Sequence, residues 1–116
     1  MSTAWNKEIL IVHLAGPGSD PFPGLPMAMQ VARNALAELP DVAIEIVVQG
    51  PSVRQLIPGA EPLENVARGI TVYACENSLR SAGMESADLQ PDVEVVPAAV
   101  SHIVKRQFQG AAYIRL

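Results

Sequence analysis

The sequence contains little of what several functional classes require. Its 116 residues include one cysteine, one tryptophan, two tyrosines and two phenylalanines, and eight Lys and Arg against twelve Asp and Glu give a formal net charge of −4. The basic residues are spread along the chain, so we expect no basic, aromatic-rich face of the kind that binds nucleic acid. We therefore predict that the protein has no nucleic-acid partner.

Long apolar runs are also missing. Pro, Gly or a charged residue interrupts each run well before the roughly 20 residues needed to cross a bilayer, and no export signal is readable in the first residues. One cysteine cannot form an internal disulfide, and with two dispersed histidines it gives no metal-ligand spacing. We therefore predict a cytoplasmic protein without a membrane partner or a bound metal.

What the sequence does contain is an alternation of strand-like and helix-like segments. The apolar patterns predict strands at 8–13, 42–48, 69–74, 93–96 and 111–115, helices at 25–39, 52–56 and 75–82, and a weak helical turn at 63–68. Alternation of this kind favours parallel strands joined by helical crossovers, with helices on both faces of the sheet. The chain length allows one hydrophobic core, so we predict a single α/β domain.

A last helix is predicted from Pro97 to the residue before Gly110. Pro97 suits the first helical position because its missing N–H is not needed there. We expect the apolar residues Val100, Ile103, Val104 and Phe108 to form the buried stripe of this helix.

Cys75 is the strongest candidate for chemistry. It directly follows the third predicted strand and begins a short helix, and ligands of open α/β sheets collect outside the carboxyl ends of the strands. Backbone N–H groups at a helix start favour the thiolate and lower the pKa of the thiol. The charge of Glu76 acts in the opposite sense, and Arg80 is the residue that could offset it. The alternative is that Cys75 is a small, inert, buried side chain.

The two histidines allow further interpretations. His13 ends the first predicted strand, where it is either a polar residue of the rim or a base that activates Cys75. A cysteine hydrolase would also need a third group to orient the imidazole, and the sequence offers no clear candidate. We expect His102, in the last helix, to be solvated or to have a packing role.

Several segments share their residues, in order, with a known protein family. They are 69–80, 83–84, 88–89, 95–97 and 107–114 and, more loosely, 13, 33–36 and 44–50. Through this ordered set the chain resembles the DsrE/DsrF-like sulfur-relay family, which includes the YchN-like proteins. The resemblance covers nearly the whole chain, but Pro97 is followed by Ala98 and Ala99 where the family often has Ser-Gly.

The resemblance implies both a structure and a function. The structure is a three-layer α/β/α sandwich over residues 1–116, with a five-stranded, mainly parallel sheet, assembled as a homotrimer or homohexamer. Cys75 would carry a persulfide, accept sulfane sulfur from a donor protein and pass it to an acceptor thiol without a cofactor. His13, Asn77, Arg80 and Pro97 would form the binding region. The alternative is a non-catalytic oligomeric module that binds a small ligand or a protein, with Cys75 in the pocket wall.

Overall fold

The computed structural model describes residues 8–60, 63 and 68–116. Its elements are β1 (Ile9–Leu14), α1 (Leu25–Glu38), β2 (Ala43–Val48), the 3-10 helix η1 (Gly50–Leu56), β3 (Ile70–Cys75), α2 (Glu76–Ser81), the 3-10 turn η2 (Ser86–Asp88), β4 (Val93–Val96), α3 (Ala99–Phe108) and β5 (Ala112–Arg115). The five predicted strands are all present, each shifted by at most one residue at either end. The weak turn predicted at 63–68 falls mostly outside the described residues.

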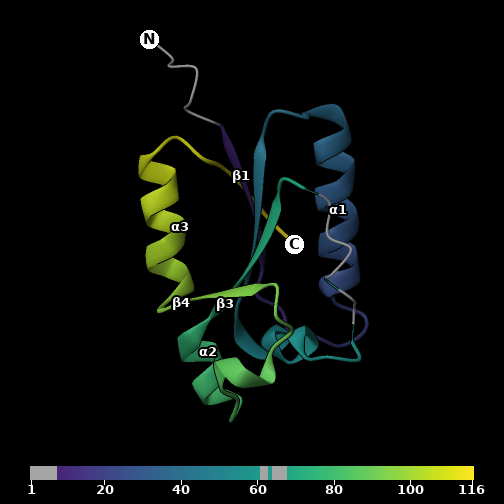
Figure 1. The fold of residues 1–116 in the computed structure, drawn as a ribbon, viewed down its shortest axis with the longest axis vertical. Coiled ribbons are helices and arrows are strands. Elements are labelled where there is room, and N and C mark those ends of the chain that lie inside the picture. Colours follow the sequence, from purple (N-terminus) through teal and green to yellow (C-terminus); the bar gives the residue numbers. More distant parts are fainter. Residues whose placement is uncertain (1–7, 61–62, 64–67) are drawn as a thin grey trace.

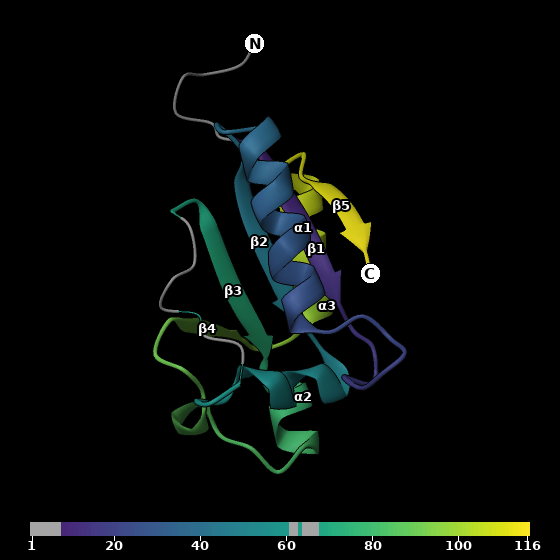
Figure 2. The same ribbon diagram turned by 90° about the vertical axis from the view of Figure 1, so that its right-hand side faces the viewer.

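The five strands form one sheet in the order β4-β3-β2-β1-β5, and every pairing is parallel. Helix α1 covers one face of this sheet and α3 the other, so the molecule has three layers (Figure 1). Figure 2 shows β5 beside β1, at the edge away from β4. The α/β/α class is therefore confirmed. Within the described part of the chain, no helix is long and apolar enough to span a bilayer.

The two faces of the sheet have different compositions because successive side chains of a strand point in opposite directions. Toward α1, the strands and the helix form a large apolar cluster, which includes Val12, Ile44 and Ile46. Toward α3, the buried cluster is small and consists of Ile11, Val47, Cys75, Ala99 and Ile103. Two buried polar side chains, His13 and Glu45, lie on strand positions of the same parity as this second cluster. The polar residues of the sheet thus gather under α3.

Helix α1 starts at the predicted residue and buries Leu25, Ala28, Met29 and Ala32. Pro26 lies in the first turn, where an N–H has no partner inside the helix. The helix ends at Glu38, one residue before the predicted end. Leu39 is the C-cap residue and is 51% exposed.

Helix α3 differs from its prediction at both its start and its buried face. Its N-cap is Ala98, in an extended conformation, so the prediction that Pro97 is the first helical residue is wrong. The predicted buried stripe is also wrong, although Ile103 is buried as expected. The other three residues of the stripe are exposed: Val100 by 63%, Val104 by 40% and Phe108 by 87%.

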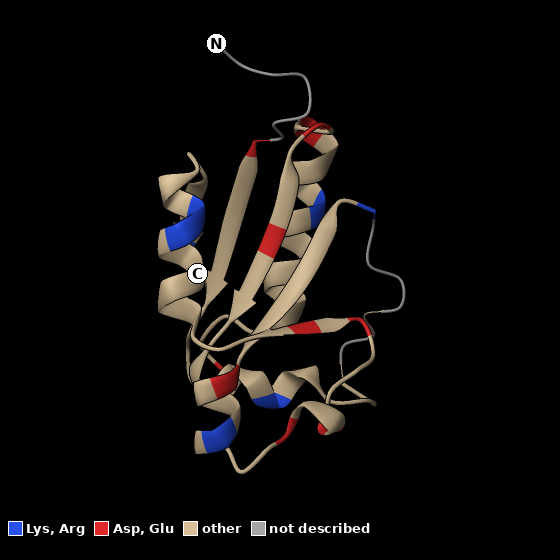
Figure 3. Cartoon of the chain, turned by 60° about the vertical axis from the view of Figure 1, so that its left-hand side comes forward, with Lys and Arg blue, Asp and Glu red and all other residues tan. Residues whose placement is uncertain are grey.

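A buried carboxylate in β2 explains which face α3 turns inward. Glu45 is 6% exposed, and its two oxygens each accept a 3.0 Å hydrogen bond from Nε of Arg106. The same carboxylate lies 2.8 Å from Nε2 of His102, which therefore has a packing role. In Figure 3 the acidic band within β2 lies at about the height of the basic bands of α3. A buried carboxylate needs such partners, so α3 turns His102 and Arg106 toward the sheet, beside the buried Ala99 and Ile103, and leaves Val100, Val104 and Phe108 on the outside.

Candidate functional site

Cys75 lies where β3 ends and α2 begins. It is the last strand residue and the N-cap of α2, with φ −77° and ψ 118°. Its side chain faces the α3 layer and is 2% exposed. The predicted helix at 75–82 is present as Glu76–Ser81, and Gly83 follows with φ +71°, a conformation that favours glycine. The chain therefore places the thiol at the carboxyl edge of the sheet.

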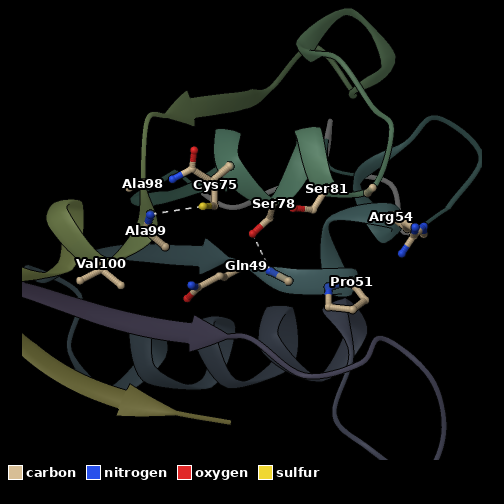
Figure 4. Close-up of a pocket in the computed structure, with 12 residues that line it drawn as sticks. Gln49, Pro51, Arg54, Cys75, Ser78, Ser81, Ala98, Ala99 and Val100 are labelled. Atoms are coloured by element: carbon tan, nitrogen blue, oxygen red, sulfur yellow. Dashed lines mark hydrogen bonds between the residues drawn. The ribbon is translucent and has the colours of Figure 1, made fainter.

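A cavity of about 280 Å³ opens beside the sulfur. Its walls come from the end of β2, from η1, from α2 and from the start of α3, and they include Gln49, Arg54, Ser78 and Ala99 (Figure 4). The described residues of the lining include one basic side chain and no acidic one. The volume is slightly below the range of about 300–1,000 Å³ that is typical of sites for small molecules. The cavity therefore has room for a small group on the sulfur.

The hydrogen bonds around Cys75 favour its thiolate. The backbone N–H of Ala99 donates to Sγ at 3.4 Å. The Oγ atom of Ser78 accepts a 2.8 Å hydrogen bond from the N–H of Gly50, which leaves the hydroxyl proton free to point at the sulfur. Burial alone raises the pKa of Cys75, but hydrogen bonds from the Ser78 hydroxyl and from the N–H groups of Ser78, Ala99 and Asn77 outweigh it. The pKa of Cys75 is therefore lowered from its ordinary value.

The other residues predicted for this region lie at different distances from the cavity. Asn77 is in the lining. Arg80 forms a 3.7 Å ion pair with Glu76 and donates a hydrogen bond to Asn77. It therefore offsets the charge of Glu76, but it is not among the described lining residues. Pro97 is exposed and directly precedes the N-cap of α3, also outside the described lining.

His13 reaches the cavity only through another side chain. Its Nε2 lies 2.8 Å from Oε1 of Gln49, and its Nδ1 lies 2.7 Å from the hydroxyl of Tyr113 on β5. Burial is the main cause that lowers the pKa of His13; the nearby charge of Arg115 acts in the same sense, and the hydrogen bond with Gln49 opposes both. Because both ring nitrogens are engaged away from the sulfur, this geometry does not support a cysteine hydrolase with His13 as the base.

Two residues at the site, Ser78 and Gln49, were not predicted from the sequence. Ser78 lies three residues after Cys75, and this spacing places both on one turn of a helix. Gln49 directly follows β2, whose last residue, Val48, pairs with Ala74 next to the cysteine. Carboxyl ends of adjacent parallel strands share one edge of the sheet, so this neighbourhood could have been inferred once the strand order was known.

Comparisons with known proteins place this geometry in a family. The sequence matches no protein-family model and no curated protein. Among solved structures, a protein of unknown function from Methanobacterium thermoautotrophicum, MTH1491, is 33% identical with a TM-score of 0.81, over 95% of this chain and 100% of that one. The ychN protein from E. coli is 16% identical with a TM-score of 0.72, over 95% of this chain and 99% of that one. The chain therefore belongs to the same family as MTH1491 and shares the fold of ychN.

Proposed function

We propose that this protein is a DsrE/DsrF-like sulfur-relay protein that carries a persulfide on Cys75. The observation that carries the proposal is the position of the thiol: the sulfur lies beside a cavity, and its surrounding hydrogen bonds lower its pKa. The thiolate is the nucleophilic form of cysteine, so these contacts favour attack on a sulfane sulfur. The fold shared with ychN and the ordered sequence segments support the family.

The proposed reaction has two exchange steps. In the first, the thiolate of Cys75 attacks the outer sulfur of a donor persulfide, a new S–S bond forms at Cys75, and the donor leaves as a thiolate with the electron pair of the broken bond. In the second, an acceptor thiolate attacks the outer sulfur of the Cys75 persulfide and releases the Cys75 thiolate. No net oxidation or reduction occurs, so a sulfurtransferase-like carrier of this kind needs no cofactor.

The direct test is transfer of sulfur to the pure protein. After incubation with a small organic persulfide and removal of the excess, intact-mass spectrometry should show the wild-type chain heavier by one sulfur atom. Cys75→Ala should show no added mass. Equal labelling of the two proteins, or no labelling of the wild type, contradicts the proposal.

The activation of the thiol can be tested without a partner. The pH dependence of Cys75 alkylation should give a pKa below the ordinary value for cysteine. Ser78→Ala should raise that pKa and slow alkylation at neutral pH roughly tenfold, because it removes one hydrogen bond to a charged group. Ser81→Ala is the matched control, since Ser81 lines the same cavity but is not among the groups that lower the pKa.

The second candidate function is a non-catalytic binding module with Cys75 in the pocket wall. The low exposure of Cys75, 2%, is the observation that favours it. This alternative predicts an unshifted thiol pKa and no uptake of sulfur, so the two experiments above distinguish it from the relay.

Self-association is part of the proposal. Val100, Val104 and Phe108 form an exposed apolar stripe on α3, and Val100 also lines the cavity. Burying such a stripe against other copies of the chain would remove apolar surface from water, in keeping with the trimer or hexamer that the family resemblance implies. We further propose a cytoplasmic location, where a lone thiol stays reduced and donor and acceptor proteins are available.

A further inference from the structure

Gln49 joins the cavity to a buried polar chain under the sheet. Its side chain lines the cavity beside Cys75, and its Oε1 lies 2.8 Å from Nε2 of His13. His13 is 7% exposed and meets the hydroxyl of Tyr113 through Nδ1 at 2.7 Å. The strands β5 and β1 and the residue that follows β2 therefore supply one continuous line of polar groups that ends at the cavity.

The contacts are consistent with one direction for each hydrogen bond along this line. An amide oxygen only accepts, so with Oε1 of Gln49 at 2.8 Å the His13 tautomer that fits carries its proton on Nε2 and donates to Gln49. Nδ1 of His13 then accepts from the Tyr113 hydroxyl. Burial, which lowers the pKa of His13, acts in the same sense because it disfavours the charged ring.

This orientation leaves the amide nitrogen of Gln49 available. Among the described residues, none accepts a hydrogen bond from that NH₂ group, although the side chain lines the cavity. With the proton of His13 on Nε2, turning the amide over would set its NH₂ group against that N–H. The line of hydrogen bonds thus keeps two N–H donors available at the cavity that holds the sulfur.

We propose that Gln49 donates a hydrogen bond to the outer sulfur of the Cys75 persulfide, and that His13 and Tyr113 are positioning residues that hold the amide in this orientation. The assignment rests on the proposed sulfur-relay function. In this arrangement the two sulfur atoms of the persulfide have separate hydrogen-bond donors in the cavity. Ser78, Asn77 and Ala99 serve Sγ, and Gln49 serves the atom that extends from it.

The chemical role follows from the charge of the persulfide. When Cys75–S–SH releases its proton to water, the negative charge lies mainly on the outer sulfur, where an N–H donor stabilises it. In the exchange with a small persulfide, the bond to the donor breaks, the bond to Cys75 forms, and the donor leaves as a thiolate. A hydrogen-bond donor at the outer sulfur therefore shifts the equilibrium of this exchange toward the protein that carries the persulfide.

The test is the equilibrium constant of that exchange, measured by intact mass at several ratios of a small organic persulfide to its thiol. Gln49→Glu keeps the oxygen that faces His13 but replaces the NH₂ with a second oxygen, and it should lower loading more than tenfold. Gln49→Leu should lower loading roughly tenfold, the effect of one hydrogen bond to a charged group. Gln30→Leu, an exposed Gln on α1, is the control and should not change loading.

A double-mutant cycle tests the positioning role. His13→Phe should lower loading in the wild-type background and have no further effect in the Gln49→Leu background. Tyr113→Phe, which removes only a hydroxyl from a side chain 37% exposed, gives the same test if His13→Phe does not fold. Equal losses in both backgrounds would show that these residues do not act through Gln49.

A second readout separates this assignment from a structural effect. The alkylation pKa of the unloaded Cys75 should be the same in wild type and Gln49→Leu, because Gln49 is not among the groups that shift it. Unchanged loading in both Gln49 variants overturns this assignment and leaves the relay intact. A wild-type protein that takes up no sulfur overturns the relay itself, and this assignment with it.

Discussion

The two faces of the sheet differ in what they bury. The face toward α1 is an apolar core that extends from Val12 through Ile46 to Ala74. The face toward α3 buries only a small apolar cluster and carries His13, Glu45 and Cys75. Burial of hydrocarbon stabilises the fold without directional contacts, whereas buried polar groups need specific partners. We therefore expect most of the stability to come from the face toward α1, and the proposed chemistry of Cys75 lies on the face toward α3.

The largest expected effect is the loss of stability when one buried Ile on each face is replaced by Ala. Ile46 and Ile11 are both fully buried, on adjacent strands and opposite faces. Truncation of a buried Ile to Ala costs about 2–5 kcal/mol. We expect Ile46→Ala near the upper end of that range and Ile11→Ala near the lower end, because the smaller cluster can collapse more easily around the missing atoms. Urea unfolding measures both losses, and equal losses would contradict the comparison.

The next effect concerns the ion pair under α3. Glu45→Ala leaves Arg106 and His102 without their carboxylate and should cost about 3 kcal/mol in urea unfolding. The double variant Glu45→Met with Arg106→Leu should lose less than Glu45→Ala, because no unpaired charge remains. If the double variant loses more, the pair is a net source of stability and the two faces differ less than proposed.

A pH-dependent effect should also originate on the α3 face. The pKa of His13 is lowered in the folded protein, so between that pKa and the ordinary value of 6.5 the unfolded chain binds more protons. The free energy of unfolding should therefore increase with pH over this range and level off above about pH 6.5. His13→Gln should flatten this part of the stability curve, whatever its effect at pH 7. Thermal unfolding at several pH values measures the slope, and an unchanged slope would assign it to another group.

The smallest expected effect on stability lies on the outer surface of α3. Phe108 is 87% exposed, so Phe108→Ser should change the free energy of unfolding of the single chain by less than about 0.5 kcal/mol. Sedimentation should nevertheless show weaker self-association if this stripe is covered by other copies. Lys105→Ser, an exposed position on the same helix, is the control. Equal association in wild type and Phe108→Ser would remove this stripe from the interface.

Local patterns were enough to predict the strands, α1 and the place of Cys75. The apolar run in β1 and the Ala-rich stripe of α1 pack mainly against hydrocarbon, so their periodicity is enough to identify them. The same rule failed for α3. Val100, Val104 and Phe108 have the spacing of a buried stripe, but Glu45, 61 residues before Arg106, draws the opposite face inward.

The site also combines features that are local in the sequence with features that depend on the order of the strands. The junction of strand and helix at Cys75 is a local feature, and so is the spacing to Ser78. The placement of Gln49 is not, since it depends on β2 lying beside β3. The orientation of its amide depends further on His13 in β1 and Tyr113 in β5, which are 100 residues apart in the chain.

The sequence by itself determined the α/β class, the order of the elements and the position of the one thiol at a strand end, because these depend on contacts between neighbouring residues and on apolar periodicity. The tertiary structure alone decided which face of α3 is buried and which side chains surround the sulfur. The reason is that polar groups from distant strands satisfy one another only after the sheet has brought them together, and no local pattern records that choice.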